Sequence, residues 1–312
     1  MTNIVLQLSP QELEKIKSYY AAQRVERNAP GVVFAAKLAD TAITVYKSGK
    51  AMFQGAGAAR EAARFGTAEA TTKKVSSAKG DTLPSNFAGL SVLGSDETGT
   101  GDYFGPVTVA AVYVPADKIE LVKELGVKDS KQLTDDYMRK IASDLKKVCV
   151  HSILTLPNDK YNALQSKGYS QVKIKAMMHN QALKHVLRKI EPERPDYILI
   201  DQFAERGIYY NHIKNEKEIV RENVLFSTKA ENLHVAVATA SILARYAFLK
   251  EMDRLADITG FPLQKGAGKK VDEMAARILA KHGEATLKSM TKWHFANTEK
   301  AKVLLRKKKT DY

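Results

Sequence analysis

The amino-acid sequence predicts an α/β protein in which a mixed β-sheet flanked by helices follows a smaller α+β unit. Three observations lead to this prediction. The first 66 residues read as one β-α-β-β-β-α unit, residues 67–88 show no apolar period, and from residue 89 a strand pair precedes strands that alternate with helices. This order of elements is typical of a mixed sheet covered by helices.

The N-terminal unit begins with "NIVLQL", residues 3–8, whose apolar side chains alternate as in a strand. Ser9, Pro10 and Glu12 then favour a helix start, with an N-cap, a proline in the first turn and a capping-box glutamate. Three strands follow in "GVVFAAKL", "TAITVYKSG" and "KAMFQG", and "AAREAARFG" closes the unit as a helix. We expect residues 1–70 to form a domain with one sheet face free for a partner.

Residues 71–88 have the composition of a linker, rich in Thr, Ser, Ala, Lys and Gly. We expect the second domain to span residues 89–312. Its predicted strands are 90–95, 107–114, 149–156, 197–200 and 223–226. Its predicted helices are 117–125, 135–147, 158–166, 170–190, 233–256, 271–282 and 284–291.

The charge balance points to a polyanionic partner. Lys and Arg number 49 against 35 Asp and Glu, which gives a net charge of +14. A basic surplus favours binding to nucleic acid, but it also aids solubility, so charge alone leaves both interpretations open.

Other features indicate a cytoplasmic protein without a membrane span. The start "MTNIVLQLS" has no basic and apolar leader, and the longest apolar segment, "LHVAVATASILARYAFL", carries His234 and Arg245, as expected of a buried helix. The single cysteine, Cys149, excludes an intramolecular disulfide and a cysteine-based zinc cluster. It lies in a strand-like run, where we expect a small buried hydrophobe.

Four carboxylates stand where predicted strands end. Asp96 and Glu97 follow "LSVLGS", Asp201 follows "YILI", and Glu231 precedes the long apolar helix. Ligand sites in open α/β sheets gather at strand ends, so these side chains are placed to converge. Clustered carboxylates raise one another's pKa unless a cation neutralises them, and oxygen donors without His or Cys suit Mg²⁺ or Mn²⁺. Two such ions would hydrolyse a phosphodiester bond.

A glycine motif, Gly99-Thr100-Gly101, follows the first two acids directly. Glycines allow the backbone to approach a ligand closely, and the 2′-hydroxyl is the group that distinguishes RNA from DNA. Each piece also has a simpler interpretation: a lone Asp as a turn residue, the glycines as a tight hairpin, Glu231 as a helix cap. The full ordered set favours a site.

Several segments together resemble ribonuclease HIII, a bacterial type 2 ribonuclease H family. They are "GSDETGTGDYFGPVTVAAVYV", "GVKDSKQL", "YILIDQF", "STKAENLHVAVATASILARYAF", "KGAGKKVD" and "KWHFANTEKA", and they span residues 89 to 305 in order. The N-terminal unit resembles the extra domain of that family, which is similar to the TATA-box-binding protein. The resemblance thus implies a ribonuclease H-like mixed sheet preceded by a TATA-box-binding-protein-like domain.

The resemblance implies an endonuclease that cuts the RNA strand of RNA–DNA hybrids with two Mg²⁺ or Mn²⁺ ions, leaving 5′-phosphate and 3′-hydroxyl ends. Its catalytic, metal-binding acids map onto Asp96, Glu97, Asp201 and Glu231. We expect Asp96 to bridge both ions, Asp201 and Glu97 to serve one, and Glu231 to serve the other. A glutamate at position 231 matches the HIII branch, since HII relatives tend to carry aspartate there.

The resemblance also implies substrate-binding residues. These are Gly99, Thr100 and Gly101 at ribose 2′-hydroxyls, and Lys128, Ser130 and Lys131 in a further segment. For the N-terminal domain we expect Tyr46, Lys47 and Lys50, from its central hairpin, to contact the hybrid. The expected partner is the hybrid duplex alone, with no obligate protein partner and a monomeric state.

Two alternatives stay open at the level of sequence. One is a ribonuclease HII-like repair enzyme that cuts at single ribonucleotides in DNA, which differs in substrate. The other is an architectural DNA-binding protein, which would have no use for four carboxylates in a basic chain.

Overall fold

The structure is a computed structural model that describes residues 3–27, 29–66, 80–127 and 133–310. Its small N-terminal unit follows the predicted element order. The strands are β1 (Asn3–Gln7), β2 (Val32–Lys37), β3 (Ala42–Tyr46) and β4 (Lys50–Gln54), and the helices are α1 (Pro10–Tyr19) and α2 (Ala58–Ala62). The strands form one antiparallel sheet in the order β1-β4-β3-β2. The capping box expected of Ser9 and Glu12 is present at the start of α1.

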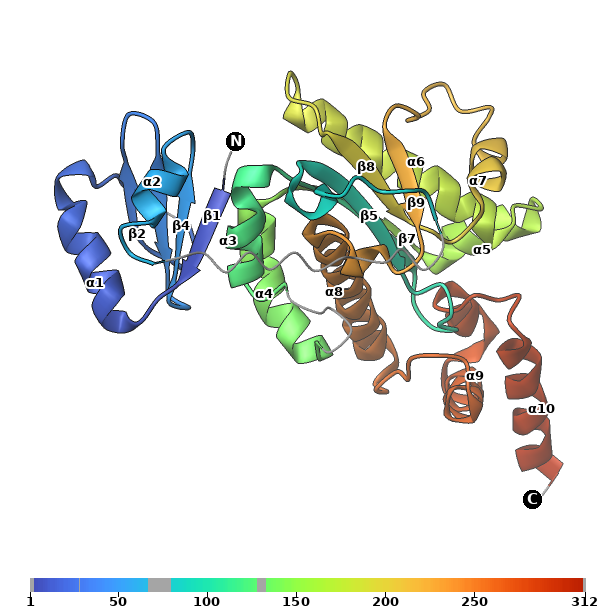
Figure 1. The fold of residues 1–312 in the computed structure, drawn as a ribbon. Coiled ribbons are helices and arrows are strands. Elements are labelled where there is room, and N and C mark those ends of the chain that lie inside the picture. Colours follow the sequence, from blue (N-terminus) through green and yellow to red (C-terminus); the bar gives the residue numbers. More distant parts are fainter. Residues whose placement is uncertain (1–2, 28, 67–79, 128–132, 311–312) are drawn as a thin grey trace.

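The two faces of this small sheet have different partners. Helices α1 and α2 cover one face, where Ile16, Val45 and Phe53 are buried in a common core. The other face turns toward α3 (Ile119–Glu124) of the larger unit, and Tyr46 and Met52 pack there with Leu121 (Figure 1). The sheet face expected to be free is therefore partly covered by the rest of the chain.

The larger unit is built on the predicted mixed sheet. Its strands are β5 (Val92–Thr98), β6 (Val107–Val114), β7 (Val150–Leu156), β8 (Tyr197–Asp201) and β9 (Val224–Ser227), in the order β7-β6-β5-β8-β9. The pairs β5–β6 and β6–β7 are antiparallel, and β5–β8 and β8–β9 are parallel. The parallel half brings the ends of β5 and β8 to the same edge of the sheet.

Helices cover both faces of this sheet. Helices α8 (Val235–Thr259) and α6 (Gln171–Ile190) pack directly on opposite faces, and the other helices of the unit are α3, α4 (Asp135–Val148), α5 (Asn158–Ser166), α7 (Arg206–His212), α9 (Lys269–Ser289) and α10 (Ala296–Thr310). Side chains on the central strand β6 alternate between the faces, as the two-residue period of a strand requires. Ala110, Val112 and Val114 pack in the core with α8, and Val109, Ala111 and Tyr113 pack in the core with α6.

Helix α8 lies unusually close to β5 because Gly94 has no side chain. A Cβ atom at Gly94 would stand 2.4 Å from the backbone nitrogen of Val237, in the first turn of α8. The start of this helix is capped by His234, whose side chain accepts a hydrogen bond from the Ala236 N–H. Close packing here fixes the beginning of α8, and the loop before it, against the sheet.

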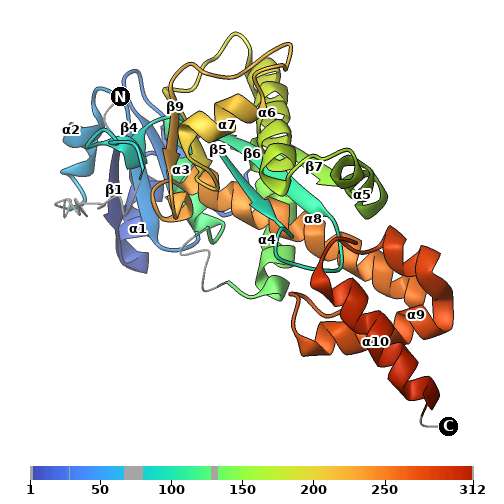
Figure 2. The same ribbon diagram turned by 90° about the vertical axis from the view of Figure 1, so that its right-hand side faces the viewer.

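Two helices were not predicted from the sequence. The short α7 follows β8, and α10 is a highly charged segment that packs beside α9 at the end of α8 farthest from the N-terminal unit (Figure 2). The two helices predicted at 271–282 and 284–291 form one element, α9, which is interrupted at Gly283. Within the described ranges, no helix has the length and apolar character needed to span a membrane.

The predicted linker divides into two parts. Residues 71–79 lie outside the described residues, whereas residues 80–88 pack against the larger unit. There the Asp81 carboxylate accepts a hydrogen bond from the Phe226 N–H at 2.8 Å and pairs with Arg206, and Phe87 is buried in the core. The second half of the predicted linker is thus part of the larger unit.

Candidate active site

Asp96 and Glu97 are consecutive residues of β5, inside the strand rather than after it. Because neighbouring side chains of a strand point to opposite faces, the two carboxylates have different surroundings. Asp96 turns toward α8, where Ser241 donates a hydrogen bond to it, and its Oδ1 also accepts from the Glu97 N–H at 2.7 Å. Glu97 turns toward α6.

Asp201 is brought beside Asp96 by strand register. It is the last residue of β8, and the parallel pairing of Ser95 with Ile200 places the two aspartates at the same level. Asp201 Oδ1 accepts a hydrogen bond from the Ala230 N–H at 2.9 Å. Glu231, the next residue, lies in a short 3₁₀ turn between β9 and α8, close enough to raise the pKa of Asp201.

The electrostatics of these acids reflect their proximity. Burial raises the pKa of Asp96 well above its ordinary range, and the charges of Asp201 and Glu97 raise it further. Burial also raises the pKa of Asp201 to about 6, with Glu231 and Glu97 adding to the effect. These are the shifts expected of carboxylates held together in a poorly solvated place.

Glu97 is stabilised by two residues that sequence reasoning did not identify. Lys175 Nζ donates to Glu97 Oε1 at 2.7 Å, and His179 Nε2 donates to Oε2 at 2.9 Å. Burial raises the pKa of Glu97, but His179 and Lys175 outweigh it, so the net shift is downward. The two residues are one helical turn apart on α6 and almost fully buried, and Phe203 lies against both.

The donor set fits a hard divalent cation. All four predicted side chains are carboxylates, and the raised pKa values of Asp96 and Asp201 show that their charges lack compensation. Both oxygens of Glu97 are engaged by Lys175 and His179. Among the described residues, no three His, Cys, Asp or Glu side chains stand in a metal-holding arrangement.

The glycine motif lies directly beyond β5. Gly99 has a φ of +93°, and a Cβ atom there would stand 2.2 Å from the Pro106 carbonyl oxygen, so the turn requires glycine. Gly101 is exposed, with open space around the position of a Cβ atom. In the part of the chain that is described, the buried Oγ1 of Thr100 has no hydrogen-bond partner. The motif thus places a bare backbone and an unsatisfied hydroxyl beside the acids.

The remaining predicted residues lie elsewhere. Lys128, Ser130 and Lys131 fall outside the described residues. In the N-terminal unit, Lys47 is exposed, but Tyr46 is buried against Leu121.

Lys50 faces the larger unit as well, because its Nζ lies 3.0 Å from a carboxylate oxygen of Glu124. The alternation of a strand tells which side chains share a face, and it does not tell whether another element covers that face. Cys149 is buried, as expected, and burial raises the pKa of its thiol to about 12.

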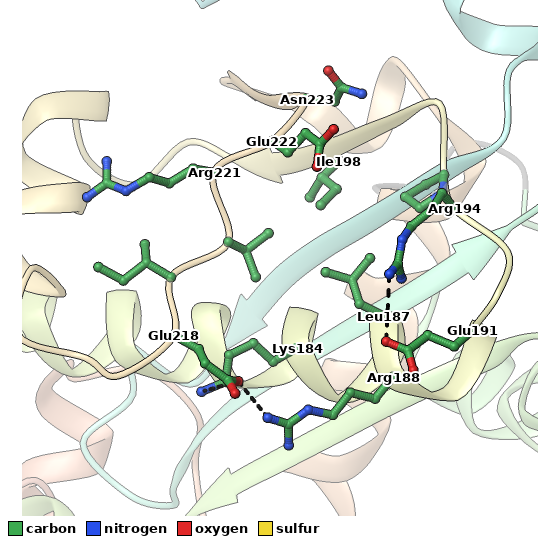
Figure 3. Close-up of a pocket in the computed structure, with 13 residues that line it drawn as sticks. Lys184, Leu187, Arg188, Glu191, Arg194, Ile198, Glu218, Arg221, Glu222 and Asn223 are labelled. Carbon is green, nitrogen blue, oxygen red and sulfur yellow. Dashed lines mark hydrogen bonds and ion pairs between the residues drawn. The ribbon is translucent and has the colours of Figure 1, made fainter.

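A cavity of about 640 Å³ lies at the opposite ends of the parallel strands (Figure 3). It is lined near the starts of β8 and β9, by Ile198 and Asn223, whereas the acids stand where β5 and β8 end. Its charged side chains pair with one another, as in Arg188 with Glu218 at 2.5 Å. The cavity contains none of the predicted site residues.

Comparisons with known proteins place the chain in a family. The profile of the family described as Ribonuclease HII matches residues 93–298, and a domain of unknown function, DUF3378, matches residues 3–78. Ribonuclease HIII of Lysinibacillus sphaericus is 69% identical over 98% of this chain and 100% of the relative. Ribonuclease HIII of Bacillus subtilis is 50% identical over 99% of this chain and 100% of the relative.

A solved structure agrees with these relatives. The crystal structure of Bst-RNase HIII in complex with Mn²⁺ matches with a TM-score of 0.70 and 42% identity, over 98% of this chain and 100% of the other. The fold, the paired carboxylates of β5 and β8 and these full-length matches lead to one conclusion. The chain belongs to the ribonuclease HIII family of ribonucleases H.

Proposed function

We propose that this chain hydrolyses the RNA strand of RNA–DNA hybrids with divalent metal ions, Mg²⁺ or Mn²⁺, and leaves 5′-phosphate and 3′-hydroxyl ends. The proposal rests above all on the juxtaposition of the buried Asp96 carboxylate and the half-buried Asp201 carboxylate, whose pKa values are raised by burial and by the charges around them. Their arrangement costs stability in the isolated protein, and a cation would relieve that cost.

Each acid has a role that its position supports. Asp96, central among the acids, would be shared by two ions, with Asp201 and Glu97 serving one of them and Glu231 the other. When bound, such ions activate water and stabilise the leaving oxygen of a phosphodiester. The chain itself supplies orientation, since the Ala230 N–H holds Asp201, and His179 and Lys175 hold Glu97.

Recognition of the hybrid is assigned to two parts of the chain. Gly99, Thr100 and Gly101 would contact ribose 2′-hydroxyls beside the acids, which suits the exposed backbone of Gly101 and the unpartnered Thr100 hydroxyl. The N-terminal domain would grip the duplex, with the exposed Lys47 available for phosphate. Tyr46 and Lys50 could take part only after the contact with α3 opens.

The substitution Asp201→Asn tests the proposal. It keeps the shape of the side chain and its acceptor for the Ala230 N–H, but it removes one carboxylate charge. We expect Mg²⁺-dependent cleavage to fall by about three orders of magnitude while hybrid affinity survives. Asp257→Asn, at an exposed carboxylate on α8, is the matched control and should cleave normally. Near-normal cleavage by the Asp201 variant would refute the assignment.

A further inference from the structure

Lys292 is a charged side chain in the interior of the protein. It lies in the segment between α9 and α10, and it is fully buried, with a relative exposure of 0%. Removing an ammonium group from water costs several kcal/mol unless hydrogen bonds replace the lost hydration. A lysine in such a position therefore needs specific partners, and its partners indicate its role.

The partners of Lys292 are two backbone carbonyls of the loop between β5 and β6. Its Nζ donates to the Asp102 carbonyl oxygen at 2.8 Å and to the Gly105 carbonyl oxygen at 2.7 Å. These acceptors follow the glycine motif at 99–101 and bracket the buried residues Tyr103 and Phe104. One ammonium group thus joins both sides of the loop.

The backbone of Lys292 joins the same loop. Its N–H donates to the Tyr103 carbonyl at 2.8 Å, and the Gly105 N–H donates to the Met290 carbonyl at 2.9 Å. Between them, Phe104 and Thr291 form an isolated antiparallel bridge. The segment at 290–292 therefore acts as a short strand beside the loop, with the side chain of Lys292 reaching across it.

Other side chains restrain the loop from different directions. Gln171 Nε2 donates to the Thr100 carbonyl at 2.9 Å, and Asn158 Nδ2 donates to the Gly105 carbonyl at 2.8 Å. The exposed Gly101 lies between two restrained carbonyls, those of Thr100 and Asp102. The conformation of its peptide groups therefore depends on these side-chain anchors.

We propose that Lys292 is a positioning residue that holds the Gly99-Thr100-Gly101 backbone in the geometry needed to read a ribose 2′-hydroxyl. This inference rests on the proposed function, and it extends it to a residue in the C-terminal segment that does not touch the acids. Lys292 acts through hydrogen bonds to the loop and makes no direct contact with substrate.

The chemistry of the amine suits this role. Burial lowers the pKa of Lys292 to about 7, with Asp102 opposing the shift. The charged form has three N–H donors and the neutral form has two, so both forms satisfy the two carbonyls. Loop geometry is therefore maintained by donors, and a side chain without donors should release it.

The test is a double-mutant cycle in which residue 292 is substituted in the protein and a 2′-hydroxyl is removed from the substrate, separately and together. The substrates are a duplex with a run of four ribonucleotides in one strand, and four matched duplexes that each replace one 2′-hydroxyl with hydrogen. For the unmodified chain we expect one replacement to lower kcat/KM at least tenfold. In Lys292→Met, kcat on the parent duplex should fall about 10- to 100-fold with KM within about threefold, as for a misplaced group.

The decisive readout is the penalty for the missing hydroxyl. In Lys292→Met we expect this penalty to shrink to less than about threefold, because groups that act together are not additive. The Mg²⁺ concentration for half-maximal cleavage should stay unchanged. An unchanged value would show that the acids are intact and that the substitution has altered only the loop. Lys288→Met is the matched control, since Lys288 is exposed in the last turn of α9, close in sequence to Lys292, and should leave every value unchanged.

A second variant covers the case in which Lys292→Met fails to fold. Lys292→Gln has a shorter side chain but retains amide donors, and it should show an intermediate hydroxyl penalty with a folded thermal transition. If a folded Met or Gln variant showed the same penalty for the missing 2′-hydroxyl as the unmodified chain, this inference would be overturned, and the proposed function would stand. No cleavage of any duplex by the unmodified chain would refute the proposed function and this inference with it.

Discussion

His179 Nε2 donates a 2.9 Å hydrogen bond to Oε2 of Glu97, which links the middle of α6 to β5, the strand that carries both Asp96 and Glu97. The ring is held from the other side by Ser95, whose Oγ lies 2.8 Å from Nδ1, and it packs against Phe203. A buried imidazole with both nitrogens engaged has a fixed orientation. It therefore fixes the orientation of the Glu97 carboxylate.

Removing this imidazole should lower the apparent affinity for Mg²⁺ more than it lowers the rate of cleavage at saturating Mg²⁺. For His179→Leu we expect the Mg²⁺ concentration for half-maximal cleavage to rise about 10- to 100-fold, the usual cost of losing a partner that orients a metal ligand. The measurement is a metal titration of initial rates. The control is His185→Leu. His185 lies on the same helix, but its ring is hydrogen-bonded to Ser152 and Gln181 and not to Glu97. Equal half-saturation in both variants would contradict the role given to His179.

Metal affinity should fall in acid because Asp201 has a raised pKa of about 6. The metal binds the ionised carboxylate, so protonation below about pH 6 competes with it. We expect the apparent metal affinity to fall by at least about tenfold per pH unit below pH 6, since Asp96, whose pKa is also raised, adds to the loss wherever it is protonated. Isothermal titration with Mn²⁺ from pH 5 to 8 measures this. A flat affinity down to pH 5 would show that Asp201 is fully ionised there.

Acid should also destabilise the cap of α8. Burial lowers the pKa of His234 to about 4, and its ring donates to the Leu90 carbonyl while accepting from the Ala236 N–H. The unfolded chain binds a proton near pH 6.5 and the folded chain does not, so stability from this residue is lost as pH falls from 6.5 to 4. The loss amounts to about 3 kcal/mol.

The variant His234→Asn isolates this effect, because asparagine caps a helix without titrating. Asp201 acts in the opposite direction over a similar range, since its raised pKa makes stability fall as pH rises from about 4 to 6. The prediction therefore concerns the difference between variant and unmodified chain in denaturant unfolding. At pH 7 we expect the variant to be less stable by about 1 kcal/mol, for the lost Leu90 bond. That deficit should shrink and then reverse toward pH 4.5, and a constant difference would contradict the account.

Gly94 should tolerate no side chain. In Gly94→Ala the new Cβ meets backbone of α8 at 2.4 Å, which only a shift of the helix or strand relieves. We expect a loss of at least about 2 kcal/mol in unfolding free energy, as for overpacking of a core. Gly207→Ala, in α7 with no atom near its Cβ position, should be neutral or slightly stabilising. A near-native thermal transition for Gly94→Ala would show that α8 is free to move from the sheet.

The sequence was sufficient to predict those parts of the fold that local patterns specify. The β-α-β-β-β-α order, the central strands and the ends of α5 follow from periodicity and capping residues. Asp96 and Asp201 were predicted to converge because ligand sites in open α/β sheets gather at strand ends, and the parallel register of β5 and β8 brings them together.

The remaining parts depend on contacts between distant segments. Lys175 and His179 lie within a long helix whose pattern shows only that one face is buried, so their contact with Glu97 could not be inferred from it. Their spacing of four residues on that face was the available signal. Lys292 gave no such signal, because its partners are backbone carbonyls of a loop 187 to 190 residues away.

Cleavage of a uniformly labelled RNA–DNA hybrid, beside a DNA duplex with one ribonucleotide, tests the central claim most directly. Each substrate is incubated with the unmodified chain in Mg²⁺, in Mn²⁺ and in a chelator, and the product ends are mapped. The account predicts metal-dependent cuts throughout the RNA strand of the hybrid, with 5′-phosphate and 3′-hydroxyl ends. Cuts confined to the single ribonucleotide, or cleavage that persists in the chelator, would contradict it.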